Sequence, residues 1–175
     1  GFSLAASWTG AIETVAFCEI ETYCQKVLQK NFPGIPIFSD ITRLRGEDIG
    51  AVDIVCGGDP CQPYSCAGKR RGKEDDRYLW PEYFRIIQEL RPPWIVRENV
   101  PGNDGMGLDK VLSDLESIGY ETAPPLEIPA CSVGSQSLRY RIYVVAHSDS
   151  QRCNTSKDEA RMVGKTSPGK QKQGA

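Results

Sequence analysis

The sequence has few residues that could bind a metal ion. It contains one histidine, His147, and none of its seven cysteines are spaced as Cys-x-x-Cys. Structural zinc sites usually need cysteine or histidine ligands in such close pairs, so no zinc template fits and we expect no metal. The odd number of cysteines gives no indication of a disulfide framework. We therefore expect mostly reduced, structural thiols and a cytoplasmic protein.

Long apolar runs and a strong excess of one charge are also missing. No stretch approaches the roughly 18 apolar residues that a membrane helix needs, so we expect no membrane partner. The formal net charge is only −2, which does not by itself indicate a nucleic-acid-binding protein. One short basic cluster, GKRRGK at residues 68–73, stands out. On its own it is typical of a solvated loop, and phosphate contact needs other support.

Short apolar runs alternate with amphipathic segments along most of the chain. Strands are predicted at residues 13–20, 35–38, 51–56, 94–96 and 141–147, and helices at residues 21–32, 78–90 and 108–118. This alternation predicts βαβ units and an α/β fold with a doubly wound, mostly parallel sheet. Residues 148–175 have no aromatic residue and are rich in Ser, Lys and Gly. We interpret them as a polar linker, or the start of a variable insertion, that follows a domain of residues 1–147.

Polar residues follow three of the predicted strands. Glu19 lies at the end of the first, Asp59 to Gln62 (DPCQ) follow another, and Glu98 to Val100 (ENV) follow a third. In doubly wound sheets, ligands bind beyond the carboxyl ends of the strands. The sequence therefore predicts a functional site where these three segments converge.

Cys61 and Glu98 are the residues in these segments with the most reactive side chains. A thiol on such a loop, near basic residues, can have a lowered pKa and act as a nucleophile, but a structural cysteine in a turn fits equally well. A buried carboxyl at position 98 would have a raised pKa and could carry a proton to a ring nitrogen; the alternative is a turn or capping carboxylate. A cysteine hydrolase is disfavoured, because His147 is the only histidine and no Cys–His pair is evident.

Three segments, in order, resemble the motifs of one known family. They are DPCQPYSCAGKRRGKEDDRYLW (residues 59–80), WIVRENVPG (94–102) and VGSQSLRYRIYVVAH (133–147). They resemble the Pro-Cys-Gln loop, the Glu-Asn-Val segment and the Gln-x-Arg-x-Arg segment of DNA (cytosine-5-)-methyltransferases, which use S-adenosylmethionine. A lone Pro-Cys-Gln would be a weak signal, whereas three motifs in order are a strong one. The resemblance extends from Gly1 to about His147.

The resemblance implies a mechanism for these residues. Cys61 would add to C6 of cytosine as a thiolate, which makes C5 reactive toward a methyl group, and Glu98 would protonate N3. Arg139 and Arg141 would orient the base or the carboxylate through forked hydrogen bonds. The base must leave the helical stack, so the implied partner is double-stranded DNA with a flipped cytosine. The residues expected to contact this substrate are Pro60, Gln62, Ser65 and Asn99.

The resemblance also implies a site for S-adenosylmethionine. Phe2 would stack on the adenine, Glu19 would bind the ribose hydroxyls, and Asp40 would read the adenine edge with its neighbour. The full set of expected cofactor contacts is Phe2, Glu19, Ile20, Asp40, Ile41, Asp59 and Leu79. Each of the polar contacts has a plainer alternative, since Glu19 could be a strand-end surface acid and Asp40 the cap of a turn.

The sequence departs from the family pattern in two respects. Ser137 stands where the third motif has Gln or His, with Gln136 one residue earlier. Of the family's glycine-rich opening loop only Gly1-Phe2 is found, and neither the first strand nor the target-recognition region can be identified. We therefore expect a partial catalytic domain of the S-adenosylmethionine-dependent methyltransferase type that lacks its first strand and the small recognition domain.

Two other functions remain open at this point. One is the same chemistry on tRNA, since a close branch of the family resembles a tRNA cytosine methyltransferase. The other is a non-catalytic binding module or pseudoenzyme. The presence of Cys61, Glu98 and Arg139 speaks against the second. The resemblance further suggests a prokaryotic or phage-encoded protein, with a cognate restriction endonuclease as a candidate genetic partner.

Overall fold

The computed structural model describes residues 1–59, 79–101 and 107–148. Its helices are α1 (Phe2–Thr9), α2 (Thr22–Asn31), α3 (Gly46–Ile49), α4 (Trp80–Leu90) and α5 (Leu108–Ser117), with a short 3-10 helix, η3 (Ala130–Val133). Its strands are β1 (Phe17–Cys18), β2 (Ile37–Phe38), β3 (Ile54–Gly57), β4 (Trp94–Asn99), β5 (Glu121–Thr122), β6 (Leu126–Pro129) and β7 (Tyr140–His147). No helix in these ranges is long and apolar enough to cross a membrane.

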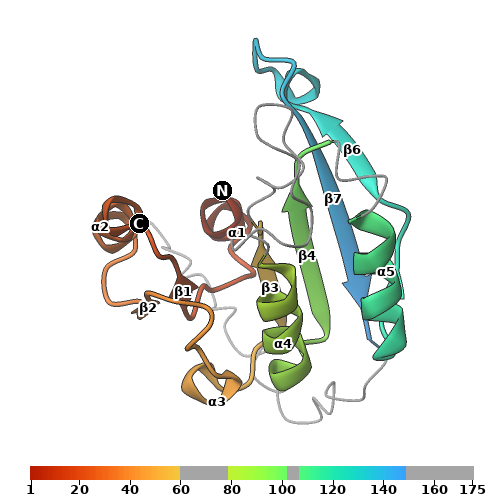
Figure 1. Ribbon diagram of the computed structural model, residues 1–175. Coiled ribbons are helices and arrows are strands. Elements are labelled where there is room, and N and C mark those ends of the chain that lie inside the picture. Colours follow the sequence, from red (N-terminus) through yellow and green to blue (C-terminus); the bar gives the residue numbers. More distant parts are fainter. Residues whose placement is uncertain (60–78, 102–106, 149–175) are drawn as a thin grey trace, which may run out of the picture.

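The strands form two sheets, with β1–β2 at the left of Figure 1 and the larger sheet at its centre and right. β1 and β2 are parallel, and so are β3 and β4. The larger sheet has the order β3-β4-β7-β5, with β6 also paired to β7. Strand β7 runs antiparallel to β4, β5 and β6. The predicted α/β fold is confirmed, and its parallel pairs lie in the part of the chain that precedes α5.

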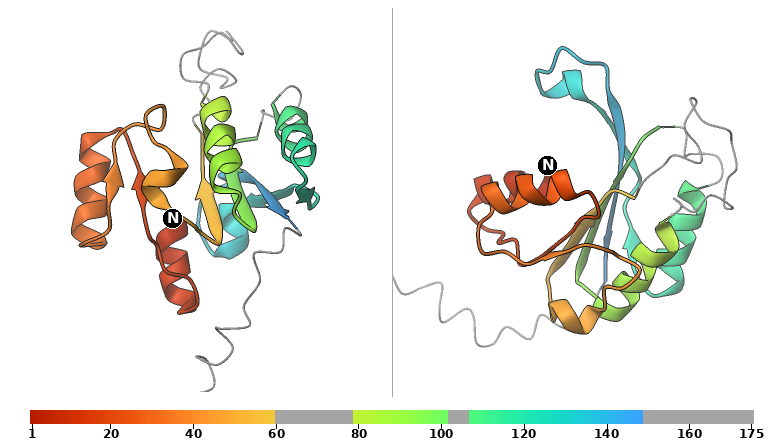
Figure 2. Two further views of the ribbon diagram at one scale, coloured as in Figure 1. Left: turned by 90° about the horizontal axis from the view of Figure 1, so that it is seen from below. Right: turned by 60° about the vertical axis from the view of Figure 1, so that its left-hand side comes forward.

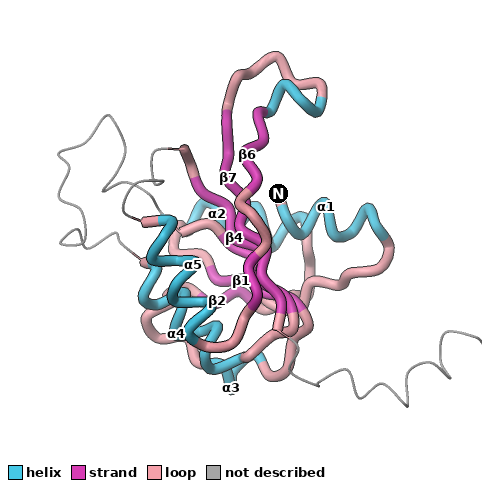
Figure 3. Tube along the Cα trace, turned by 90° about the vertical axis from the view of Figure 1, so that its right-hand side faces the viewer, coloured by secondary structure: helices cyan, strands magenta, loops and turns pink. Residues whose placement is uncertain are grey.

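Helices α4 and α5 cover one face of the larger sheet, and α1 lies on the opposite side (Figures 2 and 3). Side chains of a strand alternate between the two faces. In β4 the residues Ile95, Arg97 and Asn99 are buried, whereas Val96 and Glu98 between them are half-buried. Ile95 belongs to the hydrophobic core that includes Trp80 of α4, so the odd-numbered side chains point toward the helices and Glu98 points to the more open face.

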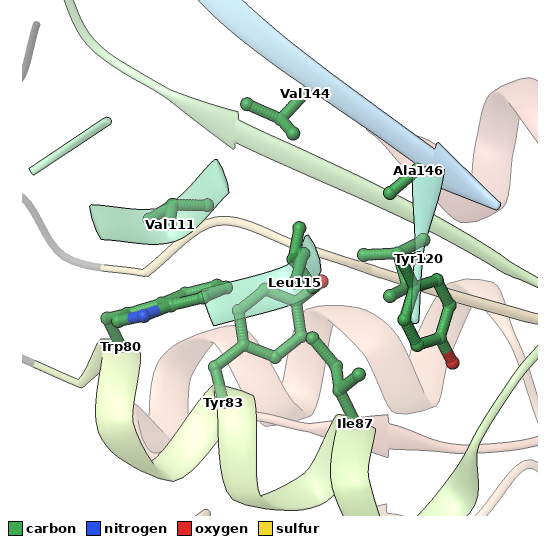
Figure 4. Close-up of a cluster of buried hydrophobic side chains, with 9 residues drawn as sticks. Trp80, Tyr83, Ile87, Val111, Leu115, Tyr120, Val144 and Ala146 are labelled. Carbon is green, nitrogen blue, oxygen red and sulfur yellow. The ribbon is translucent and has the colours of Figure 1, made fainter. Parts of the chain in front are cut away.

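The main hydrophobic core fills the space between α4, α5 and the sheet (Figure 4). Trp80, Tyr83 and Ile87 are spaced by three and four residues, so they lie on one face of α4 and all are buried. Pro81 suits the first turn of that helix because its missing N–H has no partner there in any helix. The helix ends at Arg91, which has a left-handed φ of 48°, and two prolines follow.

Helix α5 packs beside α4 in the same way. Val111 and Leu115, one turn apart, are 1% and 0% exposed. Gly119, with a φ of 86°, stands just past the helix end, where a left-handed residue terminates the helix and glycine has no steric cost. The helix that the sequence predicts at residues 108–118 is confirmed.

Several predicted strands are shorter than the sequence suggests. The strand predicted at residues 13–20 comprises only Phe17–Cys18. The apolar run at residues 51–56 forms β3 from Ile54 onward, and its residues are half-buried or exposed because β3 pairs with a single strand, β4. A nearly continuous apolar run is typical of a strand buried on both faces of a parallel sheet, and that expectation is wrong for β3. Helix α1 and strands β5 and β6 were not predicted.

Candidate functional site

A large cleft lies between the β1–β2 sheet and the β3 side of the larger sheet. Its volume is about 810 Å³, and its walls include residues of β1, β3 and α4. Six of the residues expected to contact a cofactor line it: Glu19, Ile20, Asp40, Ile41, Asp59 and Leu79. Segments far apart in the sequence thus contribute to one cavity, at the carboxyl ends of β1, β2 and β3, as the pattern of strand-end residues predicts.

Glu19 follows β1 directly and turns the chain toward α2. Its carboxylate oxygen Oε1 accepts a hydrogen bond of 2.9 Å from the backbone N–H of Glu21, and its carbonyl accepts one of 2.6 Å from the side chain of Gln25. The carboxylate is therefore held at the start of α2, beside the cleft. Oε2 has no partner among the described residues, so it is the atom that could accept a hydroxyl hydrogen bond.

Asp40 follows β2 in an equivalent position. Its Oδ1 accepts hydrogen bonds from the hydroxyl and the backbone N–H of Thr42, at 2.7 and 2.9 Å, and Oδ2 lies 3.6 Å from Nε of Arg43. The hydroxyl bond, then the backbone bond, lower the pKa of Asp40 below its usual value. Asp40 is therefore a carboxylate at neutral pH and can act only as an acceptor.

Phe2 is the one predicted cofactor residue that does not line this cleft. It opens α1, where it is half-buried. Its stacking role stays a prediction.

The apolar side of the cleft contains two thiols, Cys18 and Cys56, and the hydroxyl of Tyr83. Burial raises the pKa of both thiols, and the nearby carboxylate of Asp40 adds to the effect at Cys18. Both thiols therefore stay protonated near neutral pH and are poor nucleophiles. The Tyr83 hydroxyl is buried, and no hydrogen-bond partner for it occurs in the described part of the chain. It is a free donor beside Gly57 at the cleft wall.

Glu98 does not line this cleft; it lies against the backbone of Gly58, which does. A Cβ atom at Gly58 would lie 2.9 Å from Oε2 of Glu98 and 3.2 Å from its carbonyl oxygen. Oε2 is the far end of a flexible side chain and would have to move, and 3.2 Å to a backbone oxygen is tighter than most Cβ contacts, so a side chain at position 58 would displace the Glu98 carboxylate. The structure thus brings the Glu98 carboxylate to a point three residues before Cys61 in the sequence.

Arg141 of β7 is the ionic partner of Glu98. Its Nε lies 2.5 Å from Oε1, and the two side chains are 19% and 29% exposed. The buried acid considered from the sequence is only half-buried, because the more open face of the sheet leaves part of the carboxylate accessible. The guanidinium of Arg139, two residues earlier, makes no hydrogen bond or ion pair within the described ranges, and its residue is exposed. Its catalytic role stays a prediction.

Asp59 and Asn99 are tied to each other and to Arg97 on the helix-covered face. Both carboxylate oxygens of Asp59 accept hydrogen bonds from Arg97, at 2.6 and 2.9 Å. The Asn99 amide donates to the Asp59 carbonyl at 3.3 Å and to its Oδ1 at 3.4 Å. The expected contacts of Asp59 with the cofactor and of Asn99 with the substrate stay predictions; in this structure their side chains fix the start of the Cys61 segment.

Arg97 was not among the residues selected from the sequence, although a signal was present. A charged residue stands at the fourth position of WIVREN, in register with the buried Ile95 and Asn99. Strand alternation places such a residue on the buried face, where a charge needs a partner. The pattern therefore indicates a buried ion pair but does not identify Asp59 as the partner.

Four predicted site residues lie outside the described residues: Pro60, Cys61, Gln62 and Ser65. Their roles as nucleophile and substrate contacts remain predictions. Within the described ranges, no group of three or more histidine, cysteine, aspartate and glutamate side chains is placed to hold a metal ion.

Comparisons with known proteins point to one family. A family profile described as C-5 cytosine-specific DNA methylase matches residues 1–173. The Type II methyltransferase M2.BsuMI of Bacillus subtilis strain 168 is 35% identical over 142 residues, which cover 76% of this chain and 36% of that protein. For M.HhaI of Haemophilus parahaemolyticus the identity is 34% over 150 residues, which cover 83% of this chain and 45% of that protein.

Solved structures give the same result for the fold. A candidate DNA modification methyltransferase encoded in an Escherichia coli prophage superposes with a TM-score of 0.70 at 26% identity, over 90% of this chain and 46% of that one. A DNMT2 variant of Spodoptera frugiperda superposes with a TM-score of 0.68 at 23% identity, over 86% and 48%. The chain spans less than half the length of each of these proteins. Because the profile covers nearly all of its residues, the chain belongs to the family of C-5 cytosine-specific DNA methylases.

Proposed function

We propose that the protein carrying this chain transfers a methyl group from S-adenosylmethionine to C5 of cytosine in DNA, through a covalent adduct between Cys61 and C6. The observation that carries the proposal is the contact between Gly58 and the Glu98–Arg141 pair. It places the proposed acid at the start of the Cys61 segment. The same segment begins at the wall of the cleft that Glu19 and Asp40 line, so acid, nucleophile segment and proposed cofactor site share one edge of the fold.

The described residues of the cleft fit S-adenosylmethionine. A volume of about 810 Å³ lies within the usual range for small-ligand sites, roughly 300–1,000 Å³. Glu19 can accept from ribose hydroxyls, Asp40 can accept from an amino group, and Ile20, Ile41 and Leu79 supply apolar surface. When bound, this cofactor supplies an electrophilic methyl group on a sulfonium sulfur.

The protein residues would then act in sequence on the flipped base. The Cys61 thiolate forms a bond to C6 while Glu98 delivers a proton to N3, which neutralises the charge that the attack places on the ring. C5 becomes nucleophilic and takes the methyl group. Loss of the C5 proton to solvent then expels the thiolate, and N3 returns its proton to Glu98, which restores the neutral aromatic base. Arg141 holds the side chain of Glu98 in place, because its Nε contacts Oε1 and leaves Oε2, the atom that would carry the proton, toward Gly58.

The complete gene product provides the test of this proposal. It should transfer tritiated methyl groups to duplex DNA and form a stable adduct with DNA that contains 5-fluorocytosine, whose C5 fluorine cannot leave as a cation. Cys61→Ser should abolish both, while cofactor binding by calorimetry stays within about threefold of wild type. Cys131→Ser, which alters an exposed thiol of η3, is the matched control and should retain both activities. Transfer by Cys61→Ser would refute the mechanism.

The same assay separates the remaining functions. Transfer to tRNA but not to DNA would replace the DNA substrate by RNA, and no adduct with either by the wild-type protein would indicate a binding module. We further propose that this chain is the cofactor-binding and catalytic portion of a larger enzyme, since it covers 36% and 45% of the two curated relatives. Both relatives are Type II methyltransferases by name, so a restriction endonuclease is the candidate genetic partner.

A further inference from the structure

We propose that Arg97 is a positioning residue for the nucleophile: its buried guanidinium contacts Asp59 and Trp80, which flank the segment of residues 60–78 that carries Cys61. At one end it pairs with Asp59, and at the other its Cζ lies 5.3 Å from the centre of the Trp80 ring. Asp59 is two residues before Cys61 in the sequence, and Trp80 follows the segment after Leu79. The inference rests on the proposed function, because it assigns a role toward Cys61.

The contact with Asp59 has the geometry of a rigid fork. Nε and Nη2 of Arg97 donate to Oδ1 and Oδ2 at 2.6 and 2.9 Å. The two side chains are 2% and 3% exposed, so water does not compete for these bonds. Two parallel bonds fix both the distance and the plane of the carboxylate, which a single lysine–carboxylate contact does not do.

The main chain of Asp59 is held as well. The Asn99 amide donates to the Asp59 carbonyl at 3.3 Å, and the Asn99 side-chain oxygen accepts from the N–H of Val100 at 2.8 Å. Side chain and backbone of Asp59 are therefore both fixed to the end of β4. Any displacement of Asp59 is transmitted to Cys61 through two peptide units.

The contact with Trp80 has an equally firm support. The indole N–H of Trp80 donates to Oδ2 of Asp114 on α5 at 2.8 Å, and its ring stacks on Phe84 at 5.7 Å between centroids. Trp80 is 1% exposed. A guanidinium over an indole face is attracted by the ring quadrupole, most strongly where water is excluded. One cation thus connects the strand β4, the residue that precedes the segment and the helix that follows it.

A purely structural role is the competing explanation, and the physics of buried ion pairs separates the two. Replacing a buried pair by apolar residues of similar size is often neutral for stability, whereas removing one partner is strongly destabilising. If the pair only stabilises the fold, an apolar pair should restore everything. If it positions Cys61, an apolar pair should restore the fold but not the reaction, because the directional bonds to Asp59 are gone.

The experiment compares Asp59→Leu, Arg97→Met and the double variant Asp59→Leu/Arg97→Met in the complete gene product. The readouts are the melting temperature, the cofactor affinity, and the single-turnover rate of adduct formation with 5-fluorocytosine DNA at saturating DNA. We expect both single variants to melt lower and the double variant to recover most of the loss. The adduct rate of the double variant should stay on the order of 100-fold below wild type, the cost of a small misplacement of a reacting group. Cofactor affinity should be unchanged.

If the double variant does not fold, the variant Arg97→Lys still tests the inference. Lysine retains the charge but loses the fork and the planar face, so we expect a folded protein with a kcat roughly tenfold lower and an unchanged KM for DNA. Lys30→Met, at an exposed position of α2 that is remote from this cluster, is the control and should leave all readouts unchanged.

Two results would overturn the inference. One is a double variant that recovers both melting temperature and adduct rate, and the other is an Arg97→Lys variant with wild-type kcat. Failure of the proposed function looks different: the wild-type protein itself would then form no adduct, and the positioning role would fall with it.

Discussion

The described molecule has two regions that differ in how well they are packed. In the N-terminal unit, residues 1–42, no side chain is fully buried. Its helix α1 exposes Trp8 and α2 exposes Tyr23, each at 77%. The sheet unit, formed by β3, α4, β4, α5, β5, β6 and β7, contains the main core, where Ile87, Ile95, Leu115 and Val144 are completely buried.

This difference matches the tasks that we propose for the two regions. Glu19 and Asp40 lie on loops of a two-stranded sheet and have to contact a ligand that brings its own binding surface. Glu98, Arg97 and Arg141 lie on strands of the packed sheet, where a reacting group can be held within a fraction of an ångström. The residues whose positions must be most accurate are therefore built on the better-packed region.

The largest expected effect on stability comes from a comparison of two leucine-to-alanine substitutions, one in each region. Leu115→Ala should lower the free energy of unfolding by about 3 kcal/mol, because it leaves a cavity in a core position that is 0% exposed. Leu4→Ala, at a position that is 47% exposed, should cost less than about 1 kcal/mol. Urea denaturation at pH 7 measures both. Equal losses would show that the N-terminal unit is packed against surface beyond the described residues.

The two regions also differ in how well the sequence predicts them. Helices α4 and α5 were predicted almost to the residue, because their apolar stripes, Pro81 and Gly119 all reflect burial against the sheet. In the N-terminal unit the strand ending at Cys18 was predicted too long, and α1 was missed, because its residues FSLAASWT form no clear apolar stripe and none is buried. The spacing of apolar residues reflects burial against a neighbouring element, so it predicts only those helices and strands that are packed in this way.

For the candidate site, the sequence predicts which strand ends carry function but not how the side chains pair. The strand-end pattern predicted that Glu19, the segment from Asp59 and Glu98 converge; Glu19 and Asp59 line one cleft, and Glu98 contacts Gly58 at its wall. The ion pairs of Glu98 with Arg141 and of Asp59 with Arg97 join residues 43 and 38 positions apart in the chain, and these depend on the register between strands. Register between distant strands is a tertiary property that no local pattern encodes.

A second, intermediate effect concerns the ligand that we propose for the cleft. Glu19→Ala in the complete gene product should weaken S-adenosylmethionine binding by roughly 10- to 150-fold, since a lost hydrogen bond to a charged group contributes about 1.5–3 kcal/mol. The midpoint of unfolding should move little, because Glu19 is only half-buried. Calorimetric titration gives the affinity, with Glu13→Gln, an exposed acid of the same unit, as the control. An affinity within threefold of wild type would separate Glu19 from the cofactor site.

The smallest expected effect concerns the contacts between the two regions. Glu89 of α4 accepts a hydrogen bond of 2.7 Å from the backbone N–H of Gly46, at the start of α3, and pairs with Arg85 at 2.6 Å. Arg85 in turn donates to the carbonyl of Ile41 at 2.7 Å. These contacts attach the segment that follows β2 to the helix layer of the sheet unit.

Glu89→Ala should therefore lower the free energy of unfolding at pH 7 by about 1 kcal/mol, a value reduced by partial exposure of the carboxylate. The Gly46 amide first, and then Arg85, lower the pKa of Glu89 below its usual value of about 4.5. A lowered pKa means that the stabilisation is complete above pH 4.5 and is lost as the pH falls through the pKa of the folded state.

Urea denaturation at pH 7 should therefore show a lower unfolding midpoint for Glu89→Ala than for wild type. At pH 3 the two denaturation curves should approach each other. Gln88→Ala, at the exposed neighbouring position, should match wild type at both. A difference that persists unchanged at pH 3 would mean that helix packing, rather than the carboxylate, joins the two regions.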